Sequence, residues 1–204
     1  MGFYTEQIVP RCVDFALSRA AILRARARAL RGLHGDVLEV GFGSGLNIPY
    51  YPAEVRSVIA IEPSPVARAL ARPRIEAGRV PVRWGGLDGA TLDVPDASVD
   101  AALSTFTFCT IPDLAGALGE LRRVLRPGSL LHFLEHGRSP DPSVARWQDR
   151  LDPLQQRLAG GCHLNRAIAD RLRDAGFCLD SLETYYLPGP RFATHMFEGR
   201  ARRC

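Results

Sequence analysis

From residue 36 onward, the sequence predicts a doubly wound α/β fold, in which helices cover a mostly parallel sheet that ends in an antiparallel hairpin. Short apolar runs alternate with longer helical patterns, which is typical of parallel strands and their crossover helices. The last two apolar runs are joined by a Pro/Gly segment that is too short for a crossover helix. With 204 residues, 46% of them hydrophobic, the chain is long enough for one domain with one large core.

Residues 11–33 predict a helix in front of the alternating region. Val13 and Leu17 fall on one side of this helix, and Arg24 and Arg28 fall on another. We expect the helix to cover the core. Its basic face also allows weak contact with an anionic membrane surface.

The alternating region predicts buried strands, helices between them, and a final hairpin. The strands are expected at Asp36–Val40, Ser57–Ile61, Val80–Trp84, Val99–Ser104 and Ser129–Leu134. The helices are expected at Ser64–Ala77, Asp113–Leu125, Val144–Leu158 and Arg166–Ala175. The hairpin consists of Phe177–Tyr186 and Phe192–Ala201, which we expect to pair antiparallel across residues 187–190.

The composition excludes several classes of protein. Charged residues make up 24%, as in globular proteins, and no apolar run approaches the roughly 20 residues of a membrane-spanning helix. All 26 basic residues are arginine and the net charge is +4, but no nucleic-acid-binding motif occurs, so we expect no nucleic-acid partner. No signal peptide is recognisable and no C-x-x-C pair occurs, so we expect a cytoplasmic location. The cysteines expected to be free thiols are Cys12, Cys109, Cys162, Cys178 and Cys204.

The strongest local signal is a glycine-rich turn directly after the first strand. Gly41, Gly43 and Gly45 permit positive φ and let the backbone approach a ligand closely. Leu46 stands where the dinucleotide fingerprint needs a small residue, which disfavours a nicotinamide-dependent oxidoreductase. Glu39, two residues before the first glycine, is typical of sites for a nucleoside with an amino-acid tail. The alternative is an ordinary tight turn between a strand and a helix.

Two acidic residues follow the next strands. Glu62 ends the second strand, 17 residues after Gly45, where a carboxylate suits the two hydroxyls of a ribose. Asp88, between Leu87 and Gly89, follows the third strand and is able to accept a hydrogen bond from an adenine amino group. The alternatives are an exposed loop carboxylate for Glu62 and a common Asp-Gly turn for Asp88.

Four motifs carry a family resemblance. They are VLEVGFGSG, IEPSP, PDASVD and ELRRVLRPGS, in this order. The series resembles the class I S-adenosylmethionine-dependent methyltransferases, above all their quinone-type and type 11 branch. The resemblance implies a Rossmann-like sheet of seven strands with an antiparallel last strand. It also implies that Glu39 and the loop Gly41–Gly45 hold the methionine moiety, Glu62 the ribose, and Asp88 with Gly89 the adenine.

The resemblance extends over residues 35–186. Because the chain has one domain's length and no repeat or long linker, we expect a single domain of residues 1–204. Its expected parts are an N-terminal cover helix (1–34), a cofactor-binding half (35–135), and an acceptor lid with the C-terminal β-hairpin (136–204). Later motifs are similar to a narrower group, the membrane-associated thiol S-methyltransferases and their bacterial relatives. These motifs are TFTFCTI, FLEHGR, WQDRLDP and GGCHLNR.

The candidates for the chemistry lie late in the chain. His136, after the fifth strand, and His163, in the expected lid, are the catalytic candidates, because an imidazole can deprotonate or orient a thiol with a pKa near 8.5. A structural role for His136 is the alternative. The residues expected to line the acceptor pocket are Tyr50, Tyr51, Trp147 and Cys162, with plain packing as the alternative. No metal site is expected, because no set of His, Cys and carboxylates has the spacing of zinc or iron ligands.

The sequence therefore predicts an S-adenosylmethionine-dependent methyltransferase acting on a small-molecule acceptor, with a thiol as the first expectation. A lipid, an amine or a quinone-type hydroxyl is the next. A non-catalytic module that only binds the cofactor is the alternative from another class. The oligomeric state is left open.

Overall fold

The computed structural model describes residues 2–86 and 88–204 and contains one seven-stranded sheet. The strand order is β3-β2-β1-β4-β5-β7-β6, and β7 runs antiparallel to both of its neighbours, while β1 to β5 pair in parallel. The strands are β1 (Gly35–Val40), β2 (Val55–Ile61), β3 (Val82–Gly86), β4 (Val99–Thr105), β5 (Leu125–His136), β6 (Phe177–Tyr186) and β7 (His195–Arg203). The predicted fold class is confirmed.

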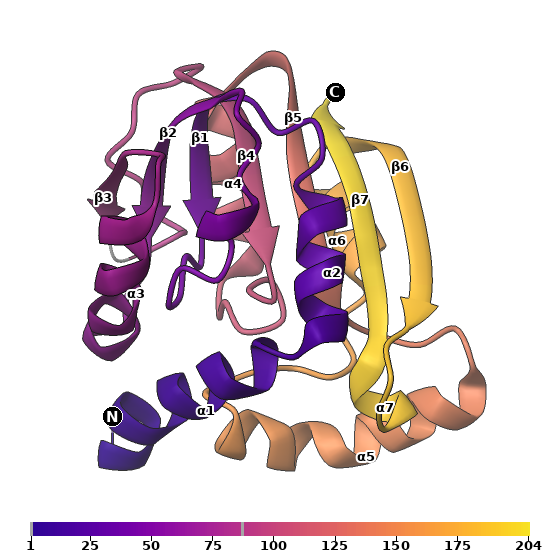
Figure 1. Ribbon diagram of the computed structural model, residues 1–204. Helices are drawn as coiled ribbons and strands as arrows, with labels where there is room; N and C mark the ends of the chain where they lie inside the picture. The colour runs from indigo at the N-terminus through magenta and orange to yellow at the C-terminus, as the bar shows by residue number, and fades with distance from the viewer. Residues whose placement is uncertain (1, 87) are drawn as a thin grey trace.

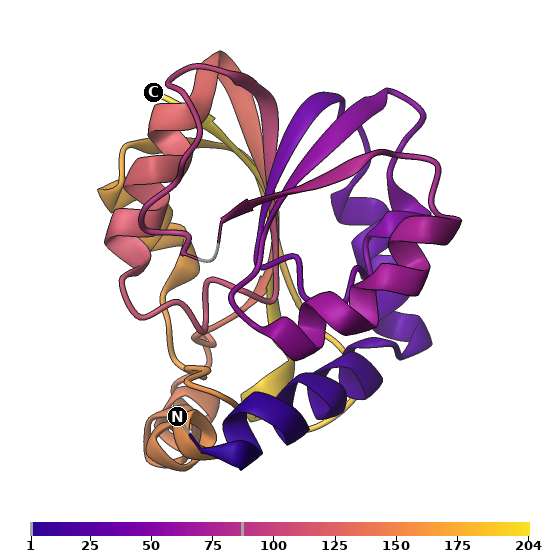
Figure 2. The same ribbon diagram turned by 90° about the vertical axis from the view of Figure 1, so that its left-hand side faces the viewer.

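Two helix layers enclose the sheet (Figure 2). The helices α2 (Ala20–Ala29) and α3 (Pro65–Ala77) cover one face, where Ala25, Leu30 and Ala71 pack with Val37 and Val58. The helices α4 (Leu114–Val124) and α6 (Ile168–Asp174) cover the other face, where they pack on alternate strand residues such as Leu38 and Val40. Alternate residues of one strand thus serve opposite cores, as expected for a parallel sheet buried on both sides.

Side chains at the helix starts explain where the crossover helices begin. Ser64 accepts a hydrogen bond from the Ala67 N–H at 3.2 Å, and Asp113 accepts one from the Gly116 N–H at 2.9 Å. Asp141 caps α5 (Pro142–Leu158) in the same way. These caps satisfy N–H groups that the first helical turn leaves unpaired.

The single helix predicted for residues 11–33 is wrong. The segment instead forms η1 (Tyr4–Ile8), α1 (Val9–Leu17) and α2. The Ser18 hydroxyl donates to the Asp14 carbonyl at 2.6 Å, and Arg19 is extended with φ −69° and ψ 142°, so the helix breaks there. As a result α2 packs on the sheet, while α1 turns across the carboxyl ends of the strands, where α5 also lies (Figure 1).

The predicted hairpin is confirmed, with one difference in its connection. Residues Arg191–Thr194 form the short helix α7, so the second strand begins at His195 rather than at Phe192. The pairing Phe177↔Arg203 brings Cys178 beside Cys204, and a disulfide joins them with a Cα–Cα distance of 5.5 Å. The expectation of free thiols is therefore wrong for these two cysteines and confirmed for the other three. Across the described residues, no helix is long and apolar enough to cross a membrane.

Candidate functional site

The glycine-rich turn forms the centre of the site at the end of β1. Gly41, Gly43 and Gly45 have φ of 71°, 58° and 78°, so side chains would be strained at all three. A Cβ on Gly41 would lie 2.0 Å from Thr107 Oγ1, so this glycine is required for packing. A Cβ on Gly43 would meet nothing closer than the Gly41 carbonyl at 3.9 Å. The turn therefore leaves space beside Gly43, where a ligand can approach the backbone.

Glu39 lies behind this turn in a buried polar network. Its side chain is 1% exposed, and its two oxygens accept hydrogen bonds from Asn47 Nδ2, at 2.9 Å, and from the Tyr51 hydroxyl. Burial raises the pKa of Glu39 to about 7, although the Tyr51 and Asn47 donors and the charge of Arg26 oppose this rise. Glu39 therefore supports the turn from behind through Asn47 and Tyr51, and its 1% exposure leaves little access for a ligand.

Arg26 is the cation of this network, and the sequence analysis missed it. It is 4% exposed, and its guanidinium donates to Asn47 Oδ1 at 2.9 Å and to Thr105 Oγ1 at 2.7 Å. Burial lowers its pKa to about 10. The available signal was its helical position, four residues after Ile22 and four before Leu30, on the apolar face of α2 instead of the basic one.

Glu62 joins the turn to the end of β2. It is 7% exposed, and its two oxygens accept hydrogen bonds from the Gly43 N–H and the Ser64 N–H, each at 2.8 Å. Each carboxylate oxygen has two lone pairs, so one on each remains for a ligand. Burial raises the pKa of this carboxyl group above its ordinary value.

The expected adenine site is only partly described. Leu87 lies outside the described residues. Asp88 is exposed and accepts a hydrogen bond from the Ala90 N–H at 2.8 Å, which is a turn contact. A Cβ on Gly89 would lie 2.9 Å from Val40 Cγ2, so Gly89 packs closely on the end of β1. The segment thus runs beside the glycine turn.

The helix α1 is tied to the glycine turn. Asp14 accepts hydrogen bonds from the Ser44 hydroxyl at 2.5 Å and from Arg74 at 2.8 Å, and Arg74 also donates to the Ser44 carbonyl. These contacts link α1, the turn and α3. The predicted cover of the core is therefore provided by α2, whereas α1 lies at the strand ends.

A second group of polar side chains lies at the ends of β4 and β5. Glu135 is fully buried and accepts hydrogen bonds from the Ser104 hydroxyl at 2.7 Å and from the backbone N–H groups of Thr107 and Phe108. Thr107 Oγ1 in turn contacts the Gly41 carbonyl at 3.4 Å. Glu135 therefore fixes the segment after β4 against the glycine turn.

His136, the last residue of β5, meets two cysteines. Its Nε2 lies 2.9 Å from Cys162 Sγ, which lies 3.4 Å from Cys109 Sγ. The ligand atoms of these three buried residues all lie within 4.8 Å of one another. The hydrogen bond with Cys109 and burial raise the pKa of Cys162, so its thiol stays protonated at neutral pH in this arrangement. The cluster could not be predicted from residue spacing, because Cys109 and Cys162 are 53 positions apart in the sequence.

His163 does not join this cluster directly. Its Nδ1 lies 3.1 Å from Asp152 Oδ2, and its backbone N–H donates to the Cys109 carbonyl at 2.8 Å. The segment after α5 is thus fastened to the segment after β4, and His163 lies beside the cluster formed by Cys109, His136 and Cys162.

Comparison with known proteins identifies the family. The family model of a methyltransferase domain matches residues 38–133. The chain is 31% identical over 175 residues to the thiol S-methyltransferase TMT1B of Rattus norvegicus, covering 81% of this chain and 70% of the relative. The chain belongs to the class I S-adenosylmethionine-dependent methyltransferases. It is also 33% identical over 147 residues to a phosphatidylethanolamine N-methyltransferase of Cereibacter sphaeroides, covering 71% of each chain.

Solved structures agree with this assignment at the level of the fold. A SAM-dependent methyltransferase from Methanosarcina mazei superposes with a TM-score of 0.65 at 20% identity, covering 86% of this chain and 95% of that one. The site of this methyltransferase fits S-adenosylmethionine. The space beside Gly43 suits the amino-acid tail of S-adenosylmethionine, and the remaining lone pairs of Glu62 suit the ribose hydroxyls.

The aromatic residues expected to line the acceptor pocket have different environments. Tyr51 is a core residue whose hydroxyl binds Glu39, and Tyr50 is half-buried. Trp147 is 56% exposed on α5, with the Arg150 guanidinium 5.8 Å from its ring centroid. The helical pattern predicted α5 correctly, and Trp147 is one of its exposed residues. Of the expected lining residues, Cys162 contacts His136, with its Sγ 2.9 Å from Nε2.

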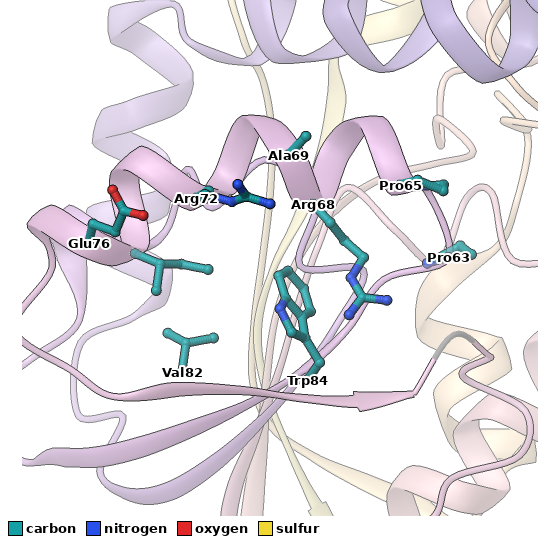
Figure 3. A pocket seen from close by; sticks show the side chains of 9 residues that line it. Pro63, Pro65, Arg68, Ala69, Arg72, Glu76, Val82 and Trp84 are labelled. Carbon is teal, nitrogen blue, oxygen red and sulfur yellow. The ribbon is translucent and has the colours of Figure 1, made fainter.

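A hollow between α3 and β3 begins beside Glu62, at Pro63 and Pro65 (Figure 3). Arg68 stacks over Trp84 across it, with the guanidinium carbon 4.2 Å from the ring centroid. The neighbouring side chains, Arg72, Glu76 and Val82, come from the outer side of α3 and from the edge strand. None of the cysteines or histidines of the methyltransferase site lines this hollow.

Proposed function

We propose that this methyltransferase transfers the methyl group to the sulfur of a small-molecule thiol. The observation that carries the proposal is the cluster of Cys109, His136 and Cys162 at the ends of β4 and β5. Sulfur and imidazole atoms form a soft, weakly polar surface that suits a thiol. The similarity to a thiol S-methyltransferase supports the same acceptor.

The carboxylates near the cluster argue against an amine acceptor. A cationic amine needs a free carboxylate, but Glu135 accepts its hydrogen bonds from Ser104, Thr107 and Phe108. Asp152 accepts from the Leu164 N–H at 2.7 Å and contacts the His163 ring. Both carboxylates therefore hold this chain's own segments in place.

The chemistry of a thiol acceptor requires little beyond alignment and ionisation. When bound, S-adenosylmethionine supplies an electrophilic methyl group on a sulfonium, whose electron pair stays with the departing sulfur as the acceptor sulfur forms its new bond to carbon. Gly43 and Glu62 would hold the donor, and the segment from Thr107 to Cys109 with His136 would border the acceptor. Holding two reactants in line contributes up to roughly 7–11 kcal/mol to lowering the barrier. A free thiol with a pKa near 8.5 is already partly ionised at neutral pH.

An acceptor panel tests this proposal. The purified protein is incubated with S-adenosylmethionine and, separately, an alkyl thiol, phosphatidylethanolamine vesicles or a hydroquinone, and released S-adenosylhomocysteine is measured by mass spectrometry. We expect turnover with the thiol and none with the other two acceptors. The Gly43→Val variant serves as the control for enzyme-independent methylation. Turnover with the phospholipid or hydroquinone alone would reassign the acceptor, and binding without any turnover would favour a non-catalytic module.

A further inference from the structure

The cluster of Cys109, His136 and Cys162 unites three segments at the carboxyl end of the sheet. Cys109 follows β4, His136 ends β5, and Cys162 follows α5. Cys109 is 2% exposed, and Cys162 and His136 are each 9% exposed. Among residues 2–86 and 88–204, these three side chains form a group whose possible ligand atoms lie within 4.8 Å of one another, close enough to bind one metal ion.

The distances suit a tetrahedral metal. Zinc binds cysteine sulfur at about 2.3 Å and histidine nitrogen at about 2.0–2.1 Å, so ligand atoms of a tetrahedral site lie roughly 3.5–3.8 Å apart. The two sulfurs already lie 3.4 Å apart, and His136 Nε2 lies 2.9 Å from Cys162 Sγ. These two distances need to lengthen by only about half an ångström to accommodate the ion, and Cys109 Sγ lies within 4.8 Å of the His136 ring nitrogen.

One nitrogen of the cluster has no partner in the described part of the chain. His136 Nδ1 is buried and makes no hydrogen bond. Buried polar atoms without a protein partner are rare. With Nε2 toward the sulfurs, Nδ1 is the ring nitrogen that a metal-ligating histidine turns to an outer partner such as water, so the protein alone does not satisfy this ring.

We propose that Cys109, His136 and Cys162 bind one Zn²⁺ ion and leave its fourth position open for the acceptor sulfur. Two thiolates and one imidazole are the soft and borderline donors that zinc prefers, and three protein ligands with one open position are the pattern of catalytic zinc sites. The ion is bound as the two cysteine thiols release two protons to solvent. No electron is transferred in this step.

The open position rests on the proposed thiol acceptor. A thiol that binds the ion loses its proton to solvent, because a coordinated thiol is deprotonated outright. The thiolate then keeps the electron pair that forms the new bond to the methyl carbon, and the neutral thioether product is a weaker ligand that leaves. Cys109 is two residues after Thr107, whose Oγ1 lies 3.4 Å from the Gly41 carbonyl, so one short segment joins the cluster to the glycine turn.

Metal binding is tested on the full chain without turnover. The metal-free protein, with the Cys178–Cys204 disulfide intact and Cys109 and Cys162 as free thiols, is titrated with Co²⁺, which replaces zinc and has visible spectra. We expect saturation at one equivalent, with a thiolate-to-cobalt charge-transfer band and the d–d bands of a tetrahedral site, both lost on addition of Zn²⁺. Cys109→Ser and Cys162→Ser should lose the charge-transfer intensity, whereas Cys12→Ser, which changes an exposed free cysteine on α1, should retain it.

The outcomes separate the metal site from the proposed acceptor. The metal site would be overturned if Co²⁺ did not bind stoichiometrically, or if Cys162→Ser had the wild-type spectrum. It would also be overturned if Cys109 and Cys162 formed a disulfide in the presence of Co²⁺. Adding 2-mercaptoethanol to the Co²⁺ form should shift the charge-transfer band, and an unshifted band would overturn the open position. A spectrum that behaves as expected in a protein that methylates no thiol would retain the metal site and remove the thiol substrate.

Discussion

Glu62 offers the sharpest test of the cofactor site, through the isosteric change Glu62→Gln. In the wild type, one carboxylate oxygen accepts the Gly43 N–H and the other accepts the Ser64 N–H. Glutamine keeps one acceptor oxygen and turns its NH₂ group toward one of these donors. The variant therefore loses one hydrogen bond within the chain and the negative charge that we expect to bind the ribose hydroxyls.

The size of the effect follows from these contacts. A hydrogen bond to a charged group contributes about 1.5–3 kcal/mol, which corresponds to a roughly tenfold to hundredfold change in a dissociation constant. Isothermal titration calorimetry with S-adenosylhomocysteine should show this weakening in Glu62→Gln and none in Glu54→Gln, which changes an exposed carboxylate. Stability without cofactor should change less than binding, because the variant also removes the desolvation of a buried charge.

The pH dependence gives the same prediction a second readout. Burial raises the pKa of Glu62, and only the ionised form is a pure acceptor, so wild-type affinity should weaken as pH falls toward this raised pKa. The effect on stability has the opposite sign. Because the folded pKa is raised, protonation of Glu62 stabilises the fold fully below the unfolded value of 4.5, and this contribution is lost as pH rises through the folded pKa. Equal affinities and equal pH profiles for Glu62→Gln and the wild type would refute the ribose assignment.

Three further perturbations probe the turn, its support and the hairpin. Gly43→Val should abolish binding of S-adenosylhomocysteine in calorimetry with only a modest loss of thermal stability, and normal binding would make the turn purely structural. Tyr51→Phe removes a donor to Glu39 and should lower the free energy of unfolding by about 1.5–3 kcal/mol in urea titrations. That loss of unfolding free energy should be larger at pH 8 than at pH 6, because the pKa of Glu39 is about 7 and the ionised carboxylate accepts the stronger hydrogen bond. A pH-independent loss would contradict the network around Glu39. Cys178→Ser should lower stability by about 2–4 kcal/mol, because the disulfide spans 26 residues, and reductant should then destabilise only the wild type.

The sheet could be predicted because its signals are local. The apolar runs of β1, β2 and β4 are buried on both faces, and the short Pro/Gly connection after Tyr186 permits only an antiparallel return. The break at Ser18 and Arg19 could not be predicted in the same way. Neither residue is a glycine or proline, and the helix ends there because α1 and α2 pack against different parts of the molecule.

The candidate site shows the same division. The glycine turn and Glu62 are marked by their position directly after a strand, so the sequence placed them correctly beside each other. The cluster around His136 is made by long-range contacts, since Cys162 is 26 positions away from His136 and 53 from Cys109. The place of Trp147 could not be predicted either, because a helical pattern does not show which exposed residues of α5 face the site.

The most direct test of the thiol proposal is methylation of an acceptor with two competing nucleophiles. Cysteamine carries a thiol and an amine, and 2-mercaptoethanol carries a thiol and a hydroxyl, so each presents the enzyme with a choice at one binding position. With S-adenosylmethionine labelled in its methyl group, mass spectrometry with fragmentation locates the label on sulfur, nitrogen or oxygen. We expect the label on sulfur in both products and no labelled product with Gly43→Val. Label on nitrogen or oxygen, or no labelled product from an enzyme that binds S-adenosylhomocysteine, would contradict it.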